Sequence, residues 1–398
     1  MASIVDHTPR RWNLRTCPAV NRDSTRARLA LPISRRRARL WSSDSIRAAT
    51  APASQGGTRN PFSPSATAAS QNATADDAYG QRRIYHAVGA FNMRRLLFVF
   101  LDGVGLGPTG PENPLSTHAD TALRRLSGGA AWTRALPETT ASQHLVRHLD
   151  ATLGVEGLPQ SGTGQATLFT GVNCAERVGR HFGPFPHSAT YEVLDHENLF
   201  HRVQTLASTP APAAFANAFP PQFFETSSRR WTVTTRCCAG AGVSLRDLDA
   251  LRADRAVAAD LTAEAWREAL QLDVSPRPAA QAAQSLFSTH RDHLCTLFEY
   301  FHTDKVGHRR GNLAPDRLMA RLNQFLGRLF DLLDPARDTL LITSDHGNVE
   351  DVSHTQHTRN PVPLVVRGWA APYFTEARDL TDVTPCIVDA LRAEADDC

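Results

Sequence analysis

Carboxylates and imidazoles follow an apolar segment of the chain in the pattern of a divalent-metal site. Residues 340–342 are apolar and lead into Asp345 and His346, and the next loop carries His354 and His357. Carboxylate oxygen and imidazole nitrogen together suit divalent transition metals and zinc. The sequence therefore predicts a metalloenzyme. His354 is better interpreted as an exposed neighbour of the site than as a ligand.

The same arrangement occurs at two other places. The apolar run 96–101 ends at Asp102, and the apolar run 294–301 is followed by Asp304 and His308. Because Asp304 and His308 lie four positions apart, they face the same way if that segment is helical. Runs of this length are typical of strands that are buried on both faces.

These strands must end at one edge of a sheet for the side chains to act together. In open α/β sheets, ligands bind in the crevice outside the carboxyl ends of the strands. We therefore expect an α/β fold, a three-layer sandwich around a mostly parallel sheet. The apolar stripe within 313–333 predicts a helix that covers one face of this sheet. Residues 213–219 are expected to add a strand, and residues 259–270 a helix.

A serine at the start of a predicted helix is the candidate nucleophile. Ser161 lies in a glycine-rich loop that leads into the segment 166–170, and Gly171 is suited to end the helix. Backbone N–H groups and the positive end of the helix dipole at such a position favour a bound phosphate. Thr163, two positions further on, is the alternative nucleophile.

Taken in order, these motifs resemble those of the alkaline phosphatase superfamily. The branch that they resemble most contains the cofactor-independent phosphoglycerate mutases and the phosphopentomutases. The resemblance runs from about Met93 to the C-terminus. It rests on the sequences DG at 102–103, SGTG at 161–164, DKVGH at 304–308, DHGN at 345–348 and HTRNPVP at 357–363.

The resemblance implies two divalent metal ions and a phosphoserine intermediate. One ion would be held by Asp102, Ser161, Asp345 and His346, and the other by Asp304, His308 and His357. Two ions about 4 Å apart would clamp a phosphoryl group and neutralise charge that develops on the leaving oxygen. Zinc and manganese both suit these ligands, and magnesium is a third choice. The implied substrate is a small phosphorylated molecule.

The chain departs from the mutases in two respects. Only 143 positions separate Ser161 from Asp304, whereas the phosphoglycerate mutases insert a large second domain in this interval. Gln165 stands where those mutases have a histidine. A phosphatase or phosphodiesterase is therefore favoured over a phosphomutase. The Ser161 segment also lacks the Cys/Ser-x-Pro-x-Arg sequence of sulfatases, and a non-catalytic metal-binding interaction protein is disfavoured because the ligand set and the serine are both complete.

Composition agrees with a globular enzyme. The chain has 398 residues, of which 41% are hydrophobic, which is enough for one large α/β domain or two medium ones. No apolar run approaches the roughly 20 residues of a membrane helix, so no membrane partner is expected. The seven cysteines show no C-x-x-C spacing, which favours a reducing compartment.

The first 92 residues differ from the rest. Residues 1–47 carry eleven arginines and three acidic residues, and residues 48–92 are poor in large aliphatic side chains. This composition is typical of an organelle transit peptide followed by a disordered linker, so we expect the metalloenzyme domain to span 93–398. A basic arm that binds nucleic acid or acidic lipid is the alternative. The remaining chain has more acidic than basic residues and gives no support to a nucleic-acid partner.

The extension is predicted to direct import into a plastid or mitochondrion, with a slight preference for the plastid, and to be cleaved before Met93. N-terminal sequencing of the protein isolated from its own cells would check this. A cytosolic mature chain that begins at Met1 or Ala2 would contradict the targeting prediction. It would not affect the proposed ligands, because all of them follow residue 101.

Overall fold

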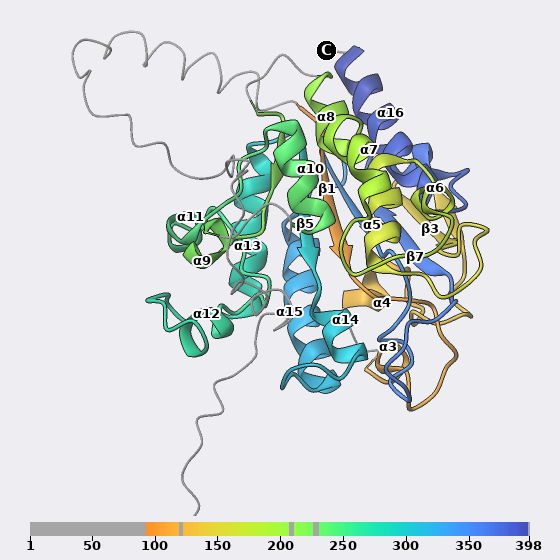
Figure 1. Cartoon of the computed structure of the whole chain (residues 1–398), viewed down its shortest axis with the longest axis horizontal. Coiled ribbons are helices and arrows are strands. Elements are labelled where there is room, and N and C mark those ends of the chain that lie inside the picture. The colour runs from red at the N-terminus through yellow and green to blue at the C-terminus, as the bar shows by residue number, and fades with distance from the viewer. Residues whose placement is uncertain (1–92, 119–121, 207–210, 226–230, 397–398) are drawn as a thin grey trace, which may run out of the picture. The chain divides into compact units, whose positions relative to one another are not determined.

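Seven strands form one sheet in the order β2-β3-β7-β6-β1-β5-β4. The computed structural model describes residues 93–118, 122–206, 211–225 and 231–396 (Figure 1). The predicted transit peptide and linker, 1–92, lie outside the described residues. The strands are β1 (Arg95–Leu101), β2 (Thr139–Ala141), β3 (His144–Leu149), β4 (Ala213–Phe215), β5 (Cys295–Tyr300), β6 (Asp338–Thr343) and β7 (Val362–Arg367).

The sheet has a parallel and an antiparallel side. Strands β6, β1, β5 and β4 are parallel neighbours. On the other side of β6, the strands β7, β3 and β2 are each antiparallel to the one before. The predicted α/β class with a mostly parallel sheet is confirmed, and the three runs that lead to the candidate ligands are the adjacent strands β6, β1 and β5.

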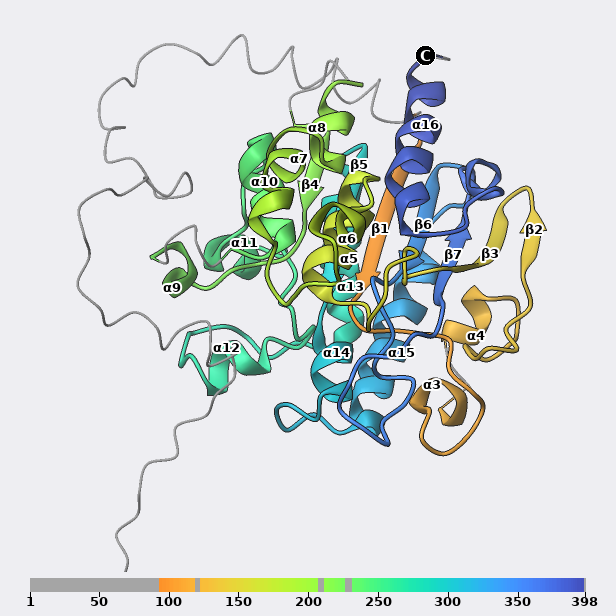
Figure 2. The ribbon, with the colours of Figure 1, turned by 45° about the vertical axis from the view of Figure 1, so that its right-hand side comes forward.

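Helices cover both faces of the sheet (Figures 1 and 2). Alternate residues of a strand point to opposite faces. Leu96 and Phe98 of β1 pack in the same core as residues of α5, α8, α10 and α16, while Leu97 and Val99 pack with residues of α4, α13 and α15. The predicted three-layer arrangement is therefore confirmed.

Most of the helices are short, and the longest, α13, α15 and α16, cover the faces of the sheet. The α-helices are α3 (Pro114–Thr117), α4 (Ala122–Leu126), α5 (Ser161–Thr170), α6 (Cys174–Val178), α7 (Tyr191–His196), α8 (Leu199–Gln204), α9 (Pro221–Phe224), α10 (Val233–Ala241), α11 (Leu248–Arg252), α12 (Glu264–Glu268), α13 (Ala279–Arg291), α14 (His302–Gly307), α15 (Pro315–Leu332) and α16 (Val383–Asp396). Three 3₁₀ turns join them, η1 (Ser188–Thr190), η3 (Ala371–Phe374) and η4 (Leu380–Asp382). None of the helices among the described residues is both long and apolar enough to cross a bilayer.

Two sequence-based boundaries were wrong. The strand expected over 213–219 ends at Phe215, because the Asn217 side chain bonds to both the N–H and the carbonyl of Glu299 in the neighbouring strand (2.9 and 2.7 Å). The helix expected over 259–270 covers only Glu264–Glu268. The carboxylate of Asp260 accepts hydrogen bonds from the N–H of Ala263, just before that helix, and from the N–H of Ala265 in its first turn, so the residues before the helix form a turn.

The buried face of the long helix α15 allows a test of how the layer of α4, α13 and α15 packs against the sheet. Leu326 is fully buried on its apolar face, so Leu326→Ala should remove contacts and leave a cavity that costs about 2–5 kcal/mol of unfolding free energy. Urea unfolding of the full chain would measure this loss. Gln324→Ala, on the exposed side of the same helix, is the matched control, and equal losses in the two variants would contradict the packing described.

Candidate metal centre

The carboxyl ends of three adjacent parallel strands bring three aspartates together. Asp345, Asp102 and Asp304 follow β6, β1 and β5, which end at the same edge of the sheet. The N–H of Gly103 donates to Asp345 Oδ1 at 3.3 Å. Gly103 has a φ of +69°, and a Cβ there would lie 2.9 Å from Oδ1 of Asp304. Glycine at this position therefore lets the three loops approach closely.

The first ligand group consists of Asp304, His308 and His357, whose candidate ligand atoms lie within 4.8 Å of one another. His308 Nε2 and His357 Nε2 are 2.9 Å apart, and each lies 3.4 Å from Asp304 Oδ1. Asp304 and His308 come from α14 and its C-terminal cap. The predicted i, i+4 pairing is thus realised on a single helical turn.

Backbone carbonyls orient both imidazoles of this group. His308 Nδ1 lies 2.7 Å from the Thr355 carbonyl, and His357 Nδ1 lies 2.7 Å from the Pro159 carbonyl. A carbonyl can only accept, so Nδ1 carries the proton in each ring. The Nε2 atom of a neutral ring then presents a lone pair, and two lone pairs facing at this distance favour a cation between them. Such hydrogen bonds to the second ring nitrogen are typical of metal-binding histidines.

The second ligand group surrounds His346. Its Nε2 atom lies 3.4 Å from Asp102 Oδ1, 3.4 Å from Asp345 Oδ2 and 2.9 Å from Ser161 Oγ. The ligand atoms of Asp102, Asp304 and His346 also lie within 4.8 Å of one another. The structure therefore brings all seven predicted site residues together, and Asp304 lies between the two groups.

Ser161 is the first residue of α5 and is buried at 8% exposure. All ten residues of this helix are buried, and Gly171 ends it with a φ of +76°, as predicted. A Cβ on Gly162 would lie 2.2 Å from the Phe185 carbonyl oxygen. The loop that contains Phe185 thus packs directly against the start of the helix and fixes the serine in place.

The alternative nucleophile, Thr163, has a different environment. Its N–H donates to the Phe182 carbonyl (2.8 Å), and its hydroxyl accepts from the Phe182 N–H (3.1 Å). These bonds attach the loop 180–187 to α5. They also occupy one of the N–H groups expected to face a phosphate. The geometry favours Ser161 over Thr163 as the nucleophile.

The surroundings of two carboxylate oxygens in the second group indicate whether a metal ion would fit there. Asp102 Oδ1 and Asp345 Oδ2 are buried and accept no hydrogen bond from the described residues. Buried carboxylate oxygens without partners are costly. Both oxygens lie 3.4 Å from the same imidazole nitrogen, His346 Nε2, which also contacts the Ser161 hydroxyl. A divalent cation would satisfy them, so the residues fit the metal that this pattern implies.

The pKa values of these side chains reflect the same crowding of buried carboxylates. Burial, then the charges of neighbouring aspartates, raise the pKa of Asp102 well above its usual value and that of Asp345 to about 7. Burial and the adjacent His357 lower the pKa of His346 to about 3. Burial opposes ionisation of Asp304, but its hydrogen bond from His357 and the nearby imidazoles lower its pKa overall. Without a cation, protons must compensate the crowded carboxylates.

A family model covers the C-terminal part of this centre. Residues 268–395 match the model of the Metalloenzyme superfamily. The matched segment contains Asp304, His308, Asp345, His346 and His357, and the fold brings Asp102 and Ser161 to them from the preceding residues. This segment of the chain is therefore similar to the Metalloenzyme superfamily, in agreement with the resemblance to the alkaline phosphatase superfamily.

Several relatives within this superfamily are similar over a limited stretch. The 2,3-bisphosphoglycerate-independent phosphoglycerate mutase of Ehrlichia ruminantium is 32% identical over 102 residues, which are 24% of this chain and 20% of the mutase. The corresponding mutase of Pseudomonas putida is 35% identical over 105 residues, 25% of this chain and 20% of the mutase. The chain thus spans about a fifth of the length of these curated relatives.

Solved structures of the superfamily superpose over more of the chain. The alkaline phosphatase from the Antarctic bacterium TAB5 aligns with 76% of this chain and 98% of its own, with 10% identity and a TM-score of 0.43.

Other polar residues near these motifs have structural partners. Gln165, which replaces the histidine of the mutases, donates to Asp102 Oδ2 at 3.4 Å. His354 is exposed and lies 3.5 Å from Asp351, outside both ligand groups. Arg177 bonds to the Ala189 carbonyl and to Glu192. Arg177 therefore points to a neighbouring helix rather than toward a substrate.

Sequence reasoning missed three buried residues at the centre. Asn348 donates to Asp304 Oδ1 at 2.6 Å. Glu350 is 1% exposed and hydrogen bonds to the loop after β1 and to both ends of the loop between β6 and β7, on which it lies. Glu299 accepts from the Thr234 hydroxyl at 2.8 Å, and burial raises its pKa to about 7. No spacing rule distinguishes these residues from ordinary loop and strand polar residues.

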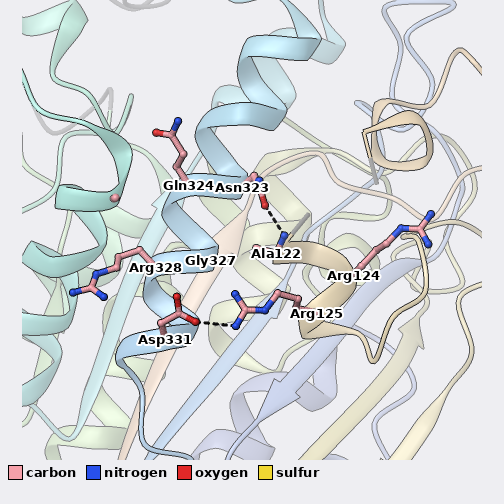
Figure 3. Close-up of a pocket in the computed structure, with 9 residues that line it drawn as sticks. Ala122, Arg124, Arg125, Asn323, Gln324, Gly327, Arg328 and Asp331 are labelled. Carbon is pink, nitrogen blue, oxygen red and sulfur yellow. Dashed lines mark hydrogen bonds and ion pairs between the residues drawn. The ribbon is translucent and has the colours of Figure 1, made fainter. Parts of the chain in front are cut away.

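A groove of about 680 Å³ lies away from the centre, between α4, α13 and α15. Three arginines line it, Arg124, Arg125 and Arg328. Figure 3 shows that the guanidinium groups of Arg124 and Arg328 point to opposite sides, and Arg125 pairs with Asp331 at 2.8 Å. The arginines therefore do not converge on one point, as a phosphate site would require.

Loss of one carboxylate should empty the second ligand group. Asp345→Asn replaces a charged ligand with a neutral amide, so the protein should lose at least one equivalent of bound divalent metal. Metal analysis after dialysis would measure the stoichiometry. Asp249→Asn, on an exposed side chain of α11, is the control. Unchanged metal content in Asp345→Asn would contradict the assignment of this ligand.

Proposed function

We propose that this chain is a two-metal phosphohydrolase that cleaves a small phosphate ester through a phosphoserine at Ser161. The observation that carries the proposal is the position of the Ser161 hydroxyl. It lies at the start of α5 and 2.9 Å from His346 Nε2, the same atom that lies 3.4 Å from Asp102 Oδ1 and from Asp345 Oδ2. A serine in this place is positioned for attack on a phosphoryl group rather than for capping a helix.

The reaction consists of two displacements at phosphorus. The Ser161 oxygen forms a bond to phosphorus while the bond to the ester oxygen breaks, and the alcohol leaves with a proton. Water then attacks the phosphoserine, the bond between phosphorus and the serine oxygen breaks, and inorganic phosphate leaves. One ester and one water thus give one alcohol and one phosphate.

The chain's own residues prepare these steps. The Ser161 hydroxyl and the carboxylates of Asp102 and Asp345 all lie next to His346 Nε2, and Asp304, His308 and His357 form the other group. When bound, two ions would lower the pKa of the attacking hydroxyl and neutralise charge on the leaving oxygen. Zinc and manganese are the proposed ions, with magnesium as a third choice, because imidazole and carboxylate ligands suit them.

The short interval between Ser161 and Asp304 favours hydrolysis of the phosphoserine over return of its phosphoryl group to the substrate. Its described residues build β4 and the helices α6 to α13, and much of this segment packs in the main core. What lies outside that core is a small apolar cluster around Trp266 and Leu251. A closed cap that excludes water is what lets a mutase return its phosphoryl group, and a cluster of this size supports no such cap.

A phosphomutase is the second candidate. The observation that favours it is that phosphoglycerate mutases are 32–35% identical to this chain over about a quarter of its length. Similarity over so limited a stretch supports shared phosphoryl chemistry more than a shared acceptor.

Substitution of the nucleophile separates the two parts of the proposal. Ser161→Ala should lower turnover of phosphate esters by roughly 10³-fold or more, because the phosphoserine cannot form. It should retain most of the bound metal, since carboxylates and imidazoles supply the other ligands. A screen of phosphate monoesters and diesters with detection of inorganic phosphate would measure turnover.

Thr163→Val is the matched control, because it removes a hydroxyl two positions away with little change in volume. Retained activity in this variant, with lost activity in Ser161→Ala, would support Ser161. Full activity in Ser161→Ala would refute it. Stoichiometric isomerisation of a substrate without release of phosphate would favour the mutase.

A further inference from the structure

A buried carboxylate outside both ligand groups joins the loops that carry them. Glu350 is 1% exposed and follows the Asp345-His346 motif. Its Oε2 atom accepts hydrogen bonds from the N–H groups of Gly105 (3.0 Å) and Asn348 (2.7 Å). Two of its four partners are therefore backbone groups of separate loops, one after β1 and one after β6.

The other carboxylate oxygen bonds to the far end of the loop between β6 and β7, the loop on which Glu350 itself lies. Oε1 of Glu350 accepts from the Asn360 amide at 2.9 Å and from the Thr358 hydroxyl. Both donors directly follow the ligand His357. The four bonds use both oxygens of one carboxylate, and no cation forms an ion pair with it among the described residues. Its negative charge is thus held by neutral donors beside the metal centre.

Three glycines make room for this side chain. A Cβ at Gly105 would lie 2.3 Å from Oε1 of Glu350, and a Cβ at Gly347 would lie 2.2 Å from the same atom. A Cβ at Gly107 would lie 2.8 Å from Cγ of Glu350. These distances are shorter than real Cβ contacts, so each loop passes the carboxylate at a position where only glycine fits without displacement.

The links continue to both ligand groups. The loop after β1 carries Asp102, and the loop after β6 carries Asp345 and His346. Asn348, whose N–H bonds to Glu350, also donates through its side chain to Asp304 Oδ1 at 2.6 Å. Glu350 is therefore hydrogen bonded directly to the loops that carry the His346 group, and it is linked to Asp304 through Asn348.

We infer that Glu350 is a positioning residue that sets the geometry of both metal-ligand groups at once. The loop after β1 and the two ends of the loop between β6 and β7 would otherwise be free to move against one another, since the ligands themselves repel when no ion is bound. Glu350 fixes their separation through four hydrogen bonds before any ion arrives. The inference rests on the proposed two-metal centre, but it concerns metal affinity and not the reaction.

The test is the full chain carrying Glu350→Gln, titrated with Co²⁺ alone. The amide keeps the size but cannot accept from Asn360 and Thr358 as the carboxylate does. Both ions should bind about 10–100-fold more weakly, as for other residues that support metal ligands. The visible spectrum at saturating Co²⁺ should also change, because the ligands no longer adopt the same geometry.

Matched variants distinguish positioning from a general loss of stability. Glu376→Gln, on an exposed side chain paired with Arg378, should leave affinity and spectrum unchanged. Thr358→Val removes one of the four bonds and should give a smaller change in the same direction, which keeps the test open if Glu350→Gln does not fold. Asn348→Ala should weaken mainly the ion bound by Asp304, His308 and His357.

Thermal unfolding of the variants without added metal would show whether Glu350 is only a structural residue. If Glu350→Gln lowers the melting temperature but leaves Co²⁺ affinity and spectrum as in the natural chain, Glu350 is only a structural residue and the inference fails. If the natural chain binds two ions but releases no phosphate from any ester, the proposed hydrolase fails while the Glu350 result still stands. A natural chain that binds no divalent ion would overturn both.

Discussion

Buried ligand atoms that face one another are the constraint on which this structure depends. Asp102 and Asp345 direct unpaired oxygens to one imidazole, and His308 and His357 direct ring nitrogens to each other at 2.9 Å. Each of these contacts is unfavourable unless a proton or a cation intervenes. The fold must therefore hold repelling groups in place, and most of the surrounding architecture serves that end.

The parallel half of the sheet provides the rigid part of the support. Strands β6, β1 and β5 are buried on both faces, so their ends cannot shift without opening the core on either side. Backbone hydrogen bonds brace the loops beyond them, such as Val349 N–H to the Gly103 carbonyl (2.9 Å) between two loops and Thr358 N–H to the Gly347 carbonyl (2.9 Å) within the loop from β6 to β7. The antiparallel half contributes β7, which leads out of the loop that carries His357.

The sequence predicted the ligands better than the residues that support them. Asp102, Asp304 and Asp345 could be located because each follows an apolar run of strand length, which is a signal that one chain carries by itself. Glu350 gives no such signal, since its role arises only when the loop after β1 meets both ends of the loop between β6 and β7 around it. The short helix α12 was mispredicted for a related reason: Asp260 satisfies backbone groups that a longer helix would have used, and a propensity pattern does not report that competition.

The place of Asp304 between the two ligand groups has a thermodynamic consequence. Its carboxylate belongs to the set with His308 and His357 and also to the set with Asp102 and His346. Two ions that drew on one carboxylate could not load independently, and whatever factor the first ion applied to the affinity of the second, the second would apply to the first. For the proposed two-metal centre, occupancy at limiting metal would therefore be a cooperative property, set by how one side chain divides its charge.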